Sequence, residues 1–306
     1  MMKHFSVLLQ ESIDSLNIKP DGIYVDCTLG RAGHAKEILK RIPKGHLYAF
    51  DKDHKALEDS AAILSGIAEN FTLIHSDYSN ISSELKKFDV KKVDGILMDI
   101  GVSSPQFDES ERGFSYRFDA RLDMRMDTSQ KLDAHYIINN YEKEDLLRIL
   151  KEYGEEKFAN SIANNIIKYR PINSTFELVE IIKNSLPNKE LKKKGHPAKQ
   201  TFQAIRIEVN NELEGLKLAL EQTLSLLAEN GRLAIITFHS LEDRIVKRKF
   251  KEVSEIKLDK HLIIKAAEYP KADFKLINKK PILANSAELE DNNRSHSAKL
   301  RVIERV

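Results

Sequence analysis

The chain has 306 residues, 41% of them hydrophobic, which is enough for one large domain or for two domains with sizeable cores. Its 49 basic and 47 acidic residues give a net charge of +2, a balance that does not by itself demand a polyanionic partner. The single cysteine, Cys27, excludes an intramolecular disulfide framework and a zinc cluster built from cysteines. No apolar run approaches the ~18 residues of a membrane span, and the N-terminus shows no secretion signal, so we expect a cytoplasmic protein.

The N-terminal third alternates short apolar runs with helical patterns. The runs that predict strands are 23–27, 46–51, 71–75 and 93–100, and the patterns that predict helices are 34–42, 54–64 and 81–88. Strands that alternate with helices are typical of parallel sheets, because each helix carries the chain back to the start of the next strand. We therefore predict a doubly wound α/β sheet.

The alternation stops in the middle of the chain and returns near its end. Amphipathic helical segments fill 132–186, a lysine-rich loop covers 187–199, and one long helix is predicted over 200–228. Strand character returns at 231–240 and is followed by a helix, and the alternating pattern of 297–306 predicts a half-buried strand at a sheet edge. We predict one sheet domain, formed by 1–108 and 212–306, interrupted by an all-helical insertion at 109–211 that recognises the substrate.

Acidic residues stand where each of the first four predicted strands ends. They are Asp26, Asp51, Asp77 and Asp99. One acid at a strand end is ordinary, because aspartate caps helices and starts turns. Four of them favour a ligand site, since open α/β sheets bind their ligands beyond the carboxyl ends of the strands.

The loop after the first strand indicates which ligand this is. A dinucleotide fingerprint G-x-G-x-x-G that starts at Gly30 requires glycine where this chain has Ala32 and Ala35, so a pyrophosphate fits poorly. The following helix still offers backbone N–H groups to a carboxylate, and Asp51 stands where an acid meets ribose hydroxyls. A ligand with a carboxylate and a ribose but no phosphate suits this site, and S-adenosylmethionine is such a ligand.

Long motifs along nearly the whole chain resemble those of the MraW/RsmH family. They are HFSVLLQE, DCTLGRAGH, DIGVSSPQFD, RGFSY with LDMRMD, YGEEKFANSIANNI, HPAKQTFQAIRIEVNNEL, GRLAIITFHSLEDRIVK and SAKLRVIER. The resemblance implies an S-adenosyl-L-methionine-dependent methyltransferase that acts on N4 of a cytidine in the decoding region of 16S ribosomal RNA, in the small ribosomal subunit. It also implies a class I methyltransferase fold with a helical insertion. A homodimer and a requirement for assembled subunits are left open.

The resemblance places the cofactor contacts, motif by motif, on Ala32, Gly33, His34, Asp51, Tyr78, Asp99 and Gln106. Asp99 is also the candidate catalytic residue, because transfer to an exocyclic amine needs an acceptor for its N–H as positive charge develops. Binding the cofactor, accepting from the amine and orienting the following turn remain three open roles for Asp99. We predict no metal, because the chain has no His, Cys and carboxylate cluster with zinc-like spacing.

The chain departs from the family pattern at two places. Ala32 replaces the second glycine of the family's G-x-G-G-H loop, and its methyl group lies where the methionine part of the cofactor is expected. Ala120 and Arg121 stand where the family has Gly-Pro, so the turn there and the details of substrate contact differ.

Segment 112–127 is a hypothetical RNA contact. It interleaves aromatic residues with arginines, and readers of unpaired RNA stack bases on aromatic rings and guanidinium planes. The alternative is an ordered loop whose aromatics pack inside the protein. In a second segment, FHSLED, we expect Ser240 and Asp243 to cap a helix rather than to form a Ser/His/Asp triad.

Other classes of protein remain as alternatives. There are three alternatives. The first is a methyltransferase of the same fold that acts on a protein or a small molecule, the second is a nicotinamide-dependent oxidoreductase, and the third is a non-catalytic RNA-binding protein. The loop at Ala32 and Ala35 disfavours nicotinamide, and a non-catalytic RNA binder has no use for a cofactor site at four strand ends.

Overall fold

The structure is a computed structural model that describes residues 6–256 and 271–306, and the chain divides into two compact units. The sheet unit comprises Met1–Gly101 and Glu214–Val306, and the helical unit comprises Val102–Leu213. The domain boundaries predicted after residues 108 and 211 differ from these divisions by a few residues. They stay a prediction, as does substrate recognition by the insertion. Each unit is described by itself.

The sheet unit contains one seven-stranded sheet with the order β3-β2-β1-β4-β5-β7-β6. Strands β1 to β5 are parallel to one another, whereas β7 is antiparallel to both β5 and β6. This confirms the predicted doubly wound fold, with β7 inserted before β6 in the 3-2-1-4-5-6 order of dinucleotide-binding sheets. The strands are β1 Ile23–Asp26, β2 His46–Asp51, β3 Phe71–His75, β4 Val93–Asp99, β5 Leu227–Thr237, β6 Phe274–Leu276 and β7 Lys299–Arg305.

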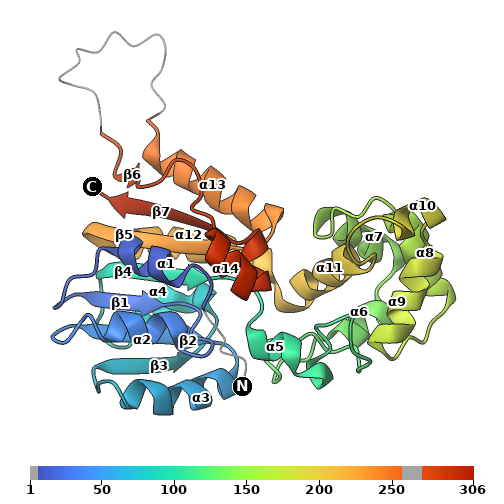
Figure 1. Cartoon of the computed structure of the whole chain (residues 1–306), viewed down its shortest axis with the longest axis horizontal. Helices are drawn as coiled ribbons and strands as arrows, with labels where there is room; N and C mark the ends of the chain where they lie inside the picture. Colours follow the sequence, from blue (N-terminus) through green and yellow to red (C-terminus); the bar gives the residue numbers. More distant parts are fainter. Residues whose placement is uncertain (1–5, 257–270) are drawn as a thin grey trace, which may run out of the picture. The chain divides into compact units, whose positions relative to one another are not determined.

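Helices cover both faces of this sheet (Figure 1). One face packs against α1 Leu9–Leu16, α2 Gly33–Leu39 and α3 His54–Ser65. The other face packs against α4 Ile81–Lys86, α12 Glu212–Leu226 and α13 Ser240–Ser254. Strand residues such as Val25 and Phe50 are fully buried because helices lie on both sides. Within the described residues, the remaining elements of this unit are η1 Tyr78–Asn80, α14 Ser286–Asp291 and η4 Asn293–Ser297.

The last strand corrects one prediction. Residues 297–306 were expected at a sheet edge, but β7 lies between β5 and β6 and is buried along most of its length. The polar residues that suggested an exposed face are paired instead. Arg301 Nε donates to Asp243 Oδ1 at 2.7 Å, and Arg232 Nε donates to Glu304 Oε2 at 2.7 Å. Such pairing offsets the free-energy cost of burying a charge.

The predicted helix over 200–228 is also wrong in detail. It consists of α11 Lys199–Asn210 and α12, separated at Asn211, whose backbone adopts the left-handed conformation with φ of 50°. Asparagine tolerates this conformation better than most residues. Strand β5 then begins at Leu227, earlier than predicted, with an irregular register opposite Val93 and Gly95.

The helical unit confirms the predicted all-helical insertion. Its buried apolar side chains form one core, which includes Leu146, Ile162 and Phe202. Among the described residues of this unit, the extended pairing is a single bridge between Arg121 and Ser174. Its elements are α5 Ser104–Asp108, η2 Ser110–Arg112, α6 Ala134–Asn140, α7 Lys143–Glu152, α8 Ala159–Lys168, α9 Thr175–Asn184, α10 Asn188–Leu191 and α11.

Over the ranges that the structure describes, none of the helices combines the length and the apolar character that crossing a bilayer requires.

Candidate functional site

Three of the predicted acids end adjacent parallel strands of the sheet unit. Asp26 ends β1, Asp51 ends the neighbouring strand β2, and Asp99 ends β4 on the other side of β1. The carboxyl ends of parallel strands lie at one edge of the sheet, so these carboxylates are brought together there. Their charges affect one another: Asp51 contributes to raising the pKa of Asp26, and Asp26 contributes to raising the pKa of Asp99.

Thr28 holds the ends of β1 and β4 together. The Asp99 backbone N–H donates to Thr28 Oγ1 at 2.7 Å, and the Thr28 backbone N–H donates to Asp26 Oδ1 at 3.0 Å. One carboxylate oxygen of Asp26 is therefore used to shape the turn. The relative position of Asp26 and Asp99 is consequently set by a short chain of hydrogen bonds.

One carboxyl oxygen of Asp26 and one of Asp99 lack hydrogen-bond donors among the described residues. Asp26 Oδ2 and Asp99 Oδ1 are buried and accept no hydrogen bond from the part of the chain that the structure describes. Burial raises the pKa of Asp26 to about 7. Burial, together with the charges of Asp26, Glu242 and Glu288, raises the pKa of Asp99 to about 8. Negative charge is thus costly at this edge until a donor or a cation faces it.

His34 lies beside Asp99 but does not neutralise it. Its Nε2 is 3.1 Å from the carbonyl oxygen of Val7, so Nε2 carries the hydrogen and donates. Burial lowers the pKa of His34 to about 4, which leaves the imidazole neutral at pH 7. The 3.8 Å separation of His34 Nδ1 from Asp99 Oδ2 is therefore not an ion pair, because the imidazole carries no charge. His34 positions the loop against the N-terminal segment.

The loop before α2 is tightly enclosed. A Cβ built on Gly33 would lie 1.7 Å from Ser6 Oγ, so a larger residue at this position would displace the Ser6 side chain. Ala32 is fully buried and has φ of 56°, in the left-handed region, which costs a residue with a Cβ roughly 1–2 kcal/mol. The family's glycine avoids this cost, so Ala32 is a strained departure from the pattern.

Asp51 braces the same loop from β2. Its Oδ2 accepts from the Gly30 backbone N–H and its Oδ1 from the Asp53 backbone N–H, both at 2.9 Å. Burial raises the pKa of Asp51. Each carboxylate oxygen has a second lone pair, so these bonds leave acceptor capacity for ligand hydroxyls. Asp51 therefore has a structural role that the sequence did not reveal.

The fourth acid behaves differently. Asp77 accepts from the Ser79 backbone N–H at 2.8 Å and contacts Lys52 Nζ at 2.6 Å. Although burial opposes the change, the Lys52 ammonium lowers the pKa of Asp77. Asp77 thus caps η1 and is neutralised. Tyr78, predicted to contact the cofactor, follows directly and has Lys52 Nζ 5.9 Å from its ring centroid.

Gln106 is the one predicted cofactor residue in the helical unit. It lies on α5, is buried, and its Oε1 accepts from the Ser103 backbone N–H at 3.0 Å. Its assignment to the cofactor stays a prediction.

The FHSLED segment corrects another prediction. Glu242, rather than Asp243, caps α13, because Glu242 Oε2 accepts from the backbone N–H groups of Phe238 at 2.8 Å and His239 at 3.2 Å. His239, not Ser240, is the residue that precedes the helix. Glu three residues after the cap is the usual capping-box spacing, and counting from His239 would have identified it.

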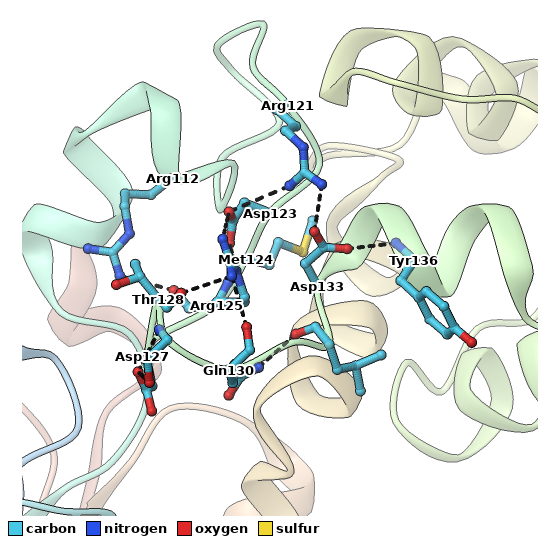
Figure 2. Close-up of polar contacts among 12 residues, drawn as sticks. Arg112, Arg121, Asp123, Met124, Arg125, Asp127, Thr128, Gln130, Asp133 and Tyr136 are labelled. Atoms are coloured by element: carbon cyan, nitrogen blue, oxygen red, sulfur yellow. Dashed lines mark hydrogen bonds and ion pairs between the residues drawn. The ribbon is translucent and has the colours of Figure 1, made fainter.

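The arginine-rich loop of the helical unit is held together by its own arginines (Figure 2). Arg125 donates from Nε and Nη2 to the two oxygens of Asp123, at 2.8 and 2.7 Å. Its Nη1 donates to the carbonyl oxygens of Thr128 and Gln130, at 2.9 and 2.8 Å. Arg112 Nη2 in turn donates to the Arg125 carbonyl oxygen at 3.0 Å.

These contacts favour the packing alternative for part of segment 112–127. Phe114 is buried, with 4% of its surface exposed, and Arg121 Nη2 donates to Asp133 Oδ2 at 2.6 Å. Ala120 and Arg121, where the family has Gly-Pro, lie against the start of α9, since the Thr175 N–H donates to the Ala120 carbonyl at 2.9 Å. Arg117 and Phe118 remain exposed.

We expect Arg125→Ala to lower the free energy of unfolding of the helical unit by about 3 kcal/mol, because it leaves Asp123 and two loop carbonyls without their charged donor. Arg117→Ala, at an exposed position of the same loop, is the control and should change it by less than about 0.5 kcal/mol. Denaturant titration measures both. Equal effects of the two substitutions would contradict the structural role of Arg125.

The residues at the carboxyl edge fit an adenosyl sulfonium cofactor. The orphaned oxygens Asp26 Oδ2 and Asp99 Oδ1 match a ligand that brings positive charge and N–H donors. Asp51 retains lone pairs for hydroxyl groups, and the Gly33 loop opens a helix whose N–H groups suit a carboxylate. An ammonium, a carboxylate and a ribose occur together in S-adenosylmethionine.

Comparison with known proteins identifies relatives that match the whole length of this chain. The protein named Ribosomal RNA small subunit methyltransferase H in Mesoplasma florum is 55% identical over 307 residues, and 100% of each chain is covered. Proteins of the same name are 54% identical in Exiguobacterium sibiricum, covering 100% of this chain and 99% of the relative, and 55% identical over 309 residues in Mycoplasma mycoides, covering 100% of both. The model of the MraW methylase family matches residues 1–306. The chain therefore belongs to the MraW methylase family.

Proposed function

We propose that the protein transfers a methyl group from S-adenosyl-L-methionine to 16S ribosomal RNA of the small subunit, at N4 of a cytidine in the decoding region. The observation that carries this proposal is an identity of 54–55% over the full length of relatives named as small-subunit RNA methyltransferases. The motif resemblance supports the finer assignment to N4 of cytidine. The acidic residues at the strand ends support the assignment of a cationic methyl donor as the cofactor.

Bound S-adenosylmethionine supplies an electrophilic methyl group on a positively charged sulfur. The sheet unit contributes the surroundings of that charge. Asp26 Oδ2 and Asp99 Oδ1 are buried acceptors, and the neutral His34 adds no competing positive charge. Electrostatic preorganisation of this kind stabilises charge without reorganisation during the reaction.

Asp99 is the candidate acceptor for the proton that the amine gives up. In the free protein its carboxyl pKa is about 8, and a bound cationic donor lowers that pKa, so that Asp99 is ionised and able to accept when the substrate amine binds. Asp99 Oδ1 accepts no hydrogen bond from the described residues, so it has a lone pair for the N–H of a substrate amine. A raised pKa is also expected of a carboxyl group that binds a cationic ligand. The proposal therefore includes both roles of Asp99, cofactor binding and proton acceptance.

We expect Asp51→Ala to weaken S-adenosylmethionine binding about 10- to 150-fold, because a hydrogen bond to a charged group contributes roughly 1.5–3 kcal/mol. Calorimetric titration measures the affinity. The matched control is Asp94→Ala, since Asp94 also accepts a backbone N–H, that of Ile23 at 3.0 Å, but at the opposite end of the strands. A change below about twofold for Asp51→Ala, or an equal loss in both variants, counts against the ribose assignment.

Methylation of ribosomal RNA tests the function itself. Mass spectrometry of 16S nucleosides from a strain that lacks the protein should show the loss of one N4-methylated cytidine. Purified protein should restore it on small subunits from that strain when S-adenosylmethionine is present. Unchanged nucleosides in the deletion strain would instead favour a protein or small-molecule substrate for this methylase.

A further inference from the structure

One surface of the helical unit gathers aromatic rings and cations that are exposed or half-buried. It comprises Tyr116, Arg117, Phe118, Phe176, Lys183 and His196, and we call it the aromatic–basic surface. These residues come from three separate parts of the chain: the loop before residue 120, helix α9, and the loop before α11. All of them lie within one unit, so their arrangement does not depend on the other unit.

A stacked pair of rings lies at its centre. The rings of Tyr116 and His196 are parallel within 8°, with centroids 4.1 Å apart. Phe202 supports Tyr116 from the core with an edge-on contact at 5.7 Å. His196 Nδ1 accepts from the Ala198 N–H at 3.3 Å, which leaves Nε2 of the neutral ring to carry the proton. The stack is therefore fixed in place rather than formed by free side chains.

Two phenylalanines add solvent-exposed rings to this surface. Phe118 is 47% exposed and Phe176 is 44% exposed. Their backbones lie side by side: Thr175 Oγ1 donates to the Phe118 carbonyl at 2.6 Å, and the Phe176 N–H donates to Asp119 Oδ1 at 3.3 Å. A single exposed ring is common on protein surfaces, but two on hydrogen-bonded segments next to a ring stack indicate a binding surface.

Cations converge on the same place. Burial, together with the charges of Lys183 and Arg117, lowers the pKa of His196, so both cations lie near its ring. Lys183 Nζ also contacts Glu180 Oε1 at 2.7 Å, and Glu180 is 63% exposed. An exposed ion pair of this type contributes little stability, so a polyanion can displace the carboxylate at small cost.

We propose that the aromatic–basic surface binds an unpaired stretch of RNA, whose bases stack on Phe118 and Phe176 while Arg117 and Lys183 contact its phosphates. This inference rests on the proposed function, because it assigns part of the RNA substrate to the helical unit. Exposed π faces combined with cations are what proteins use to hold single-stranded nucleic acid. Duplex RNA offers its phosphates but keeps its bases stacked, so the rings favour unpaired RNA.

The test compares binding of a short fluorescein-labelled single-stranded RNA to the full chain and its variants by fluorescence anisotropy. Phe118→Ala should weaken binding at least about fivefold, because stacking of one base contributes roughly 1–3 kcal/mol. Phe88→Ala is the matched control, since Phe88 is 45% exposed and belongs to the sheet unit. The control should bind RNA like the wild type.

The salt dependence tests the cations separately. Arg117→Ala should reduce the slope of log affinity against log salt by about 0.7, the contribution of one phosphate contact on a single strand. Arg41→Ala, an exposed arginine of the sheet unit, should leave the slope unchanged. Both phenylalanine variants and both arginine variants should bind S-adenosylmethionine like the wild type, because none of them belongs to the cofactor edge.

The outcomes separate this inference from the proposed function. Loss of single-stranded RNA binding in Phe118→Ala, with Phe88→Ala and cofactor affinity unaffected, supports it. Wild-type RNA binding by Phe118→Ala, or equal losses in Phe118→Ala and Phe88→Ala, overturns it even if the wild-type protein methylates small subunits. Failure of the wild-type protein to methylate ribosomal RNA would overturn the proposed function, whereas the RNA binding of the variants would still report on this surface.

Discussion

The carboxyl edge of the sheet depends on two buried carboxyl groups for which the described residues supply too few hydrogen-bond donors. Asp26 Oδ2 and Asp99 Oδ1 are buried, accept nothing from the described residues and belong to carboxyl groups whose pKa values rise to about 7 and about 8. A buried carboxylate without a partner costs free energy, so it persists where function needs it. In the proposed site a cationic methyl donor faces these two carboxyl groups, and this proposal links the strand ends to the methyl transfer of the family.

The surrounding structure keeps these carboxylates in place. Thr28 joins the ends of β1 and β4, Asp51 braces the Gly30 loop, and His34 attaches that loop to the N-terminal segment. In the helical unit, hydrogen bonds from a side chain likewise fix the conformation of a loop. There Arg125 organises the loop that bears its exposed aromatic residues. In both units charged side chains form hydrogen bonds with backbone groups, as Asp51 and Arg125 do. The candidates for ligand binding are the polar atoms of the sheet unit without such a partner among the described residues, and the exposed aromatic rings of the helical unit.

Much of this was predictable from the sequence, because local patterns determine it. The strand runs and their terminal acids predicted the doubly wound sheet and the acid positions at its edge. Pairing across the fold was not predictable in this way. The alternating pattern of β7 resembled that of a half-buried edge strand, since nothing local shows that Arg301 pairs with Asp243 or Glu304 with Arg232. The arginines of segment 112–127 likewise resembled RNA contacts, yet Arg125 bonds the loop that contains it.

Proton release on cofactor binding tests the central claim most directly. Near neutral pH the free protein holds protons on Asp26 and Asp99, and a bound cation lowers both pKa values, so binding must release protons and tighten as pH rises through 7 and 8. Calorimetric titration of S-adenosylmethionine in buffers of different ionisation enthalpy measures this release. We expect protons to be released by the wild type and fewer by Asp26→Asn. No release, or net uptake, by the wild type would contradict the account.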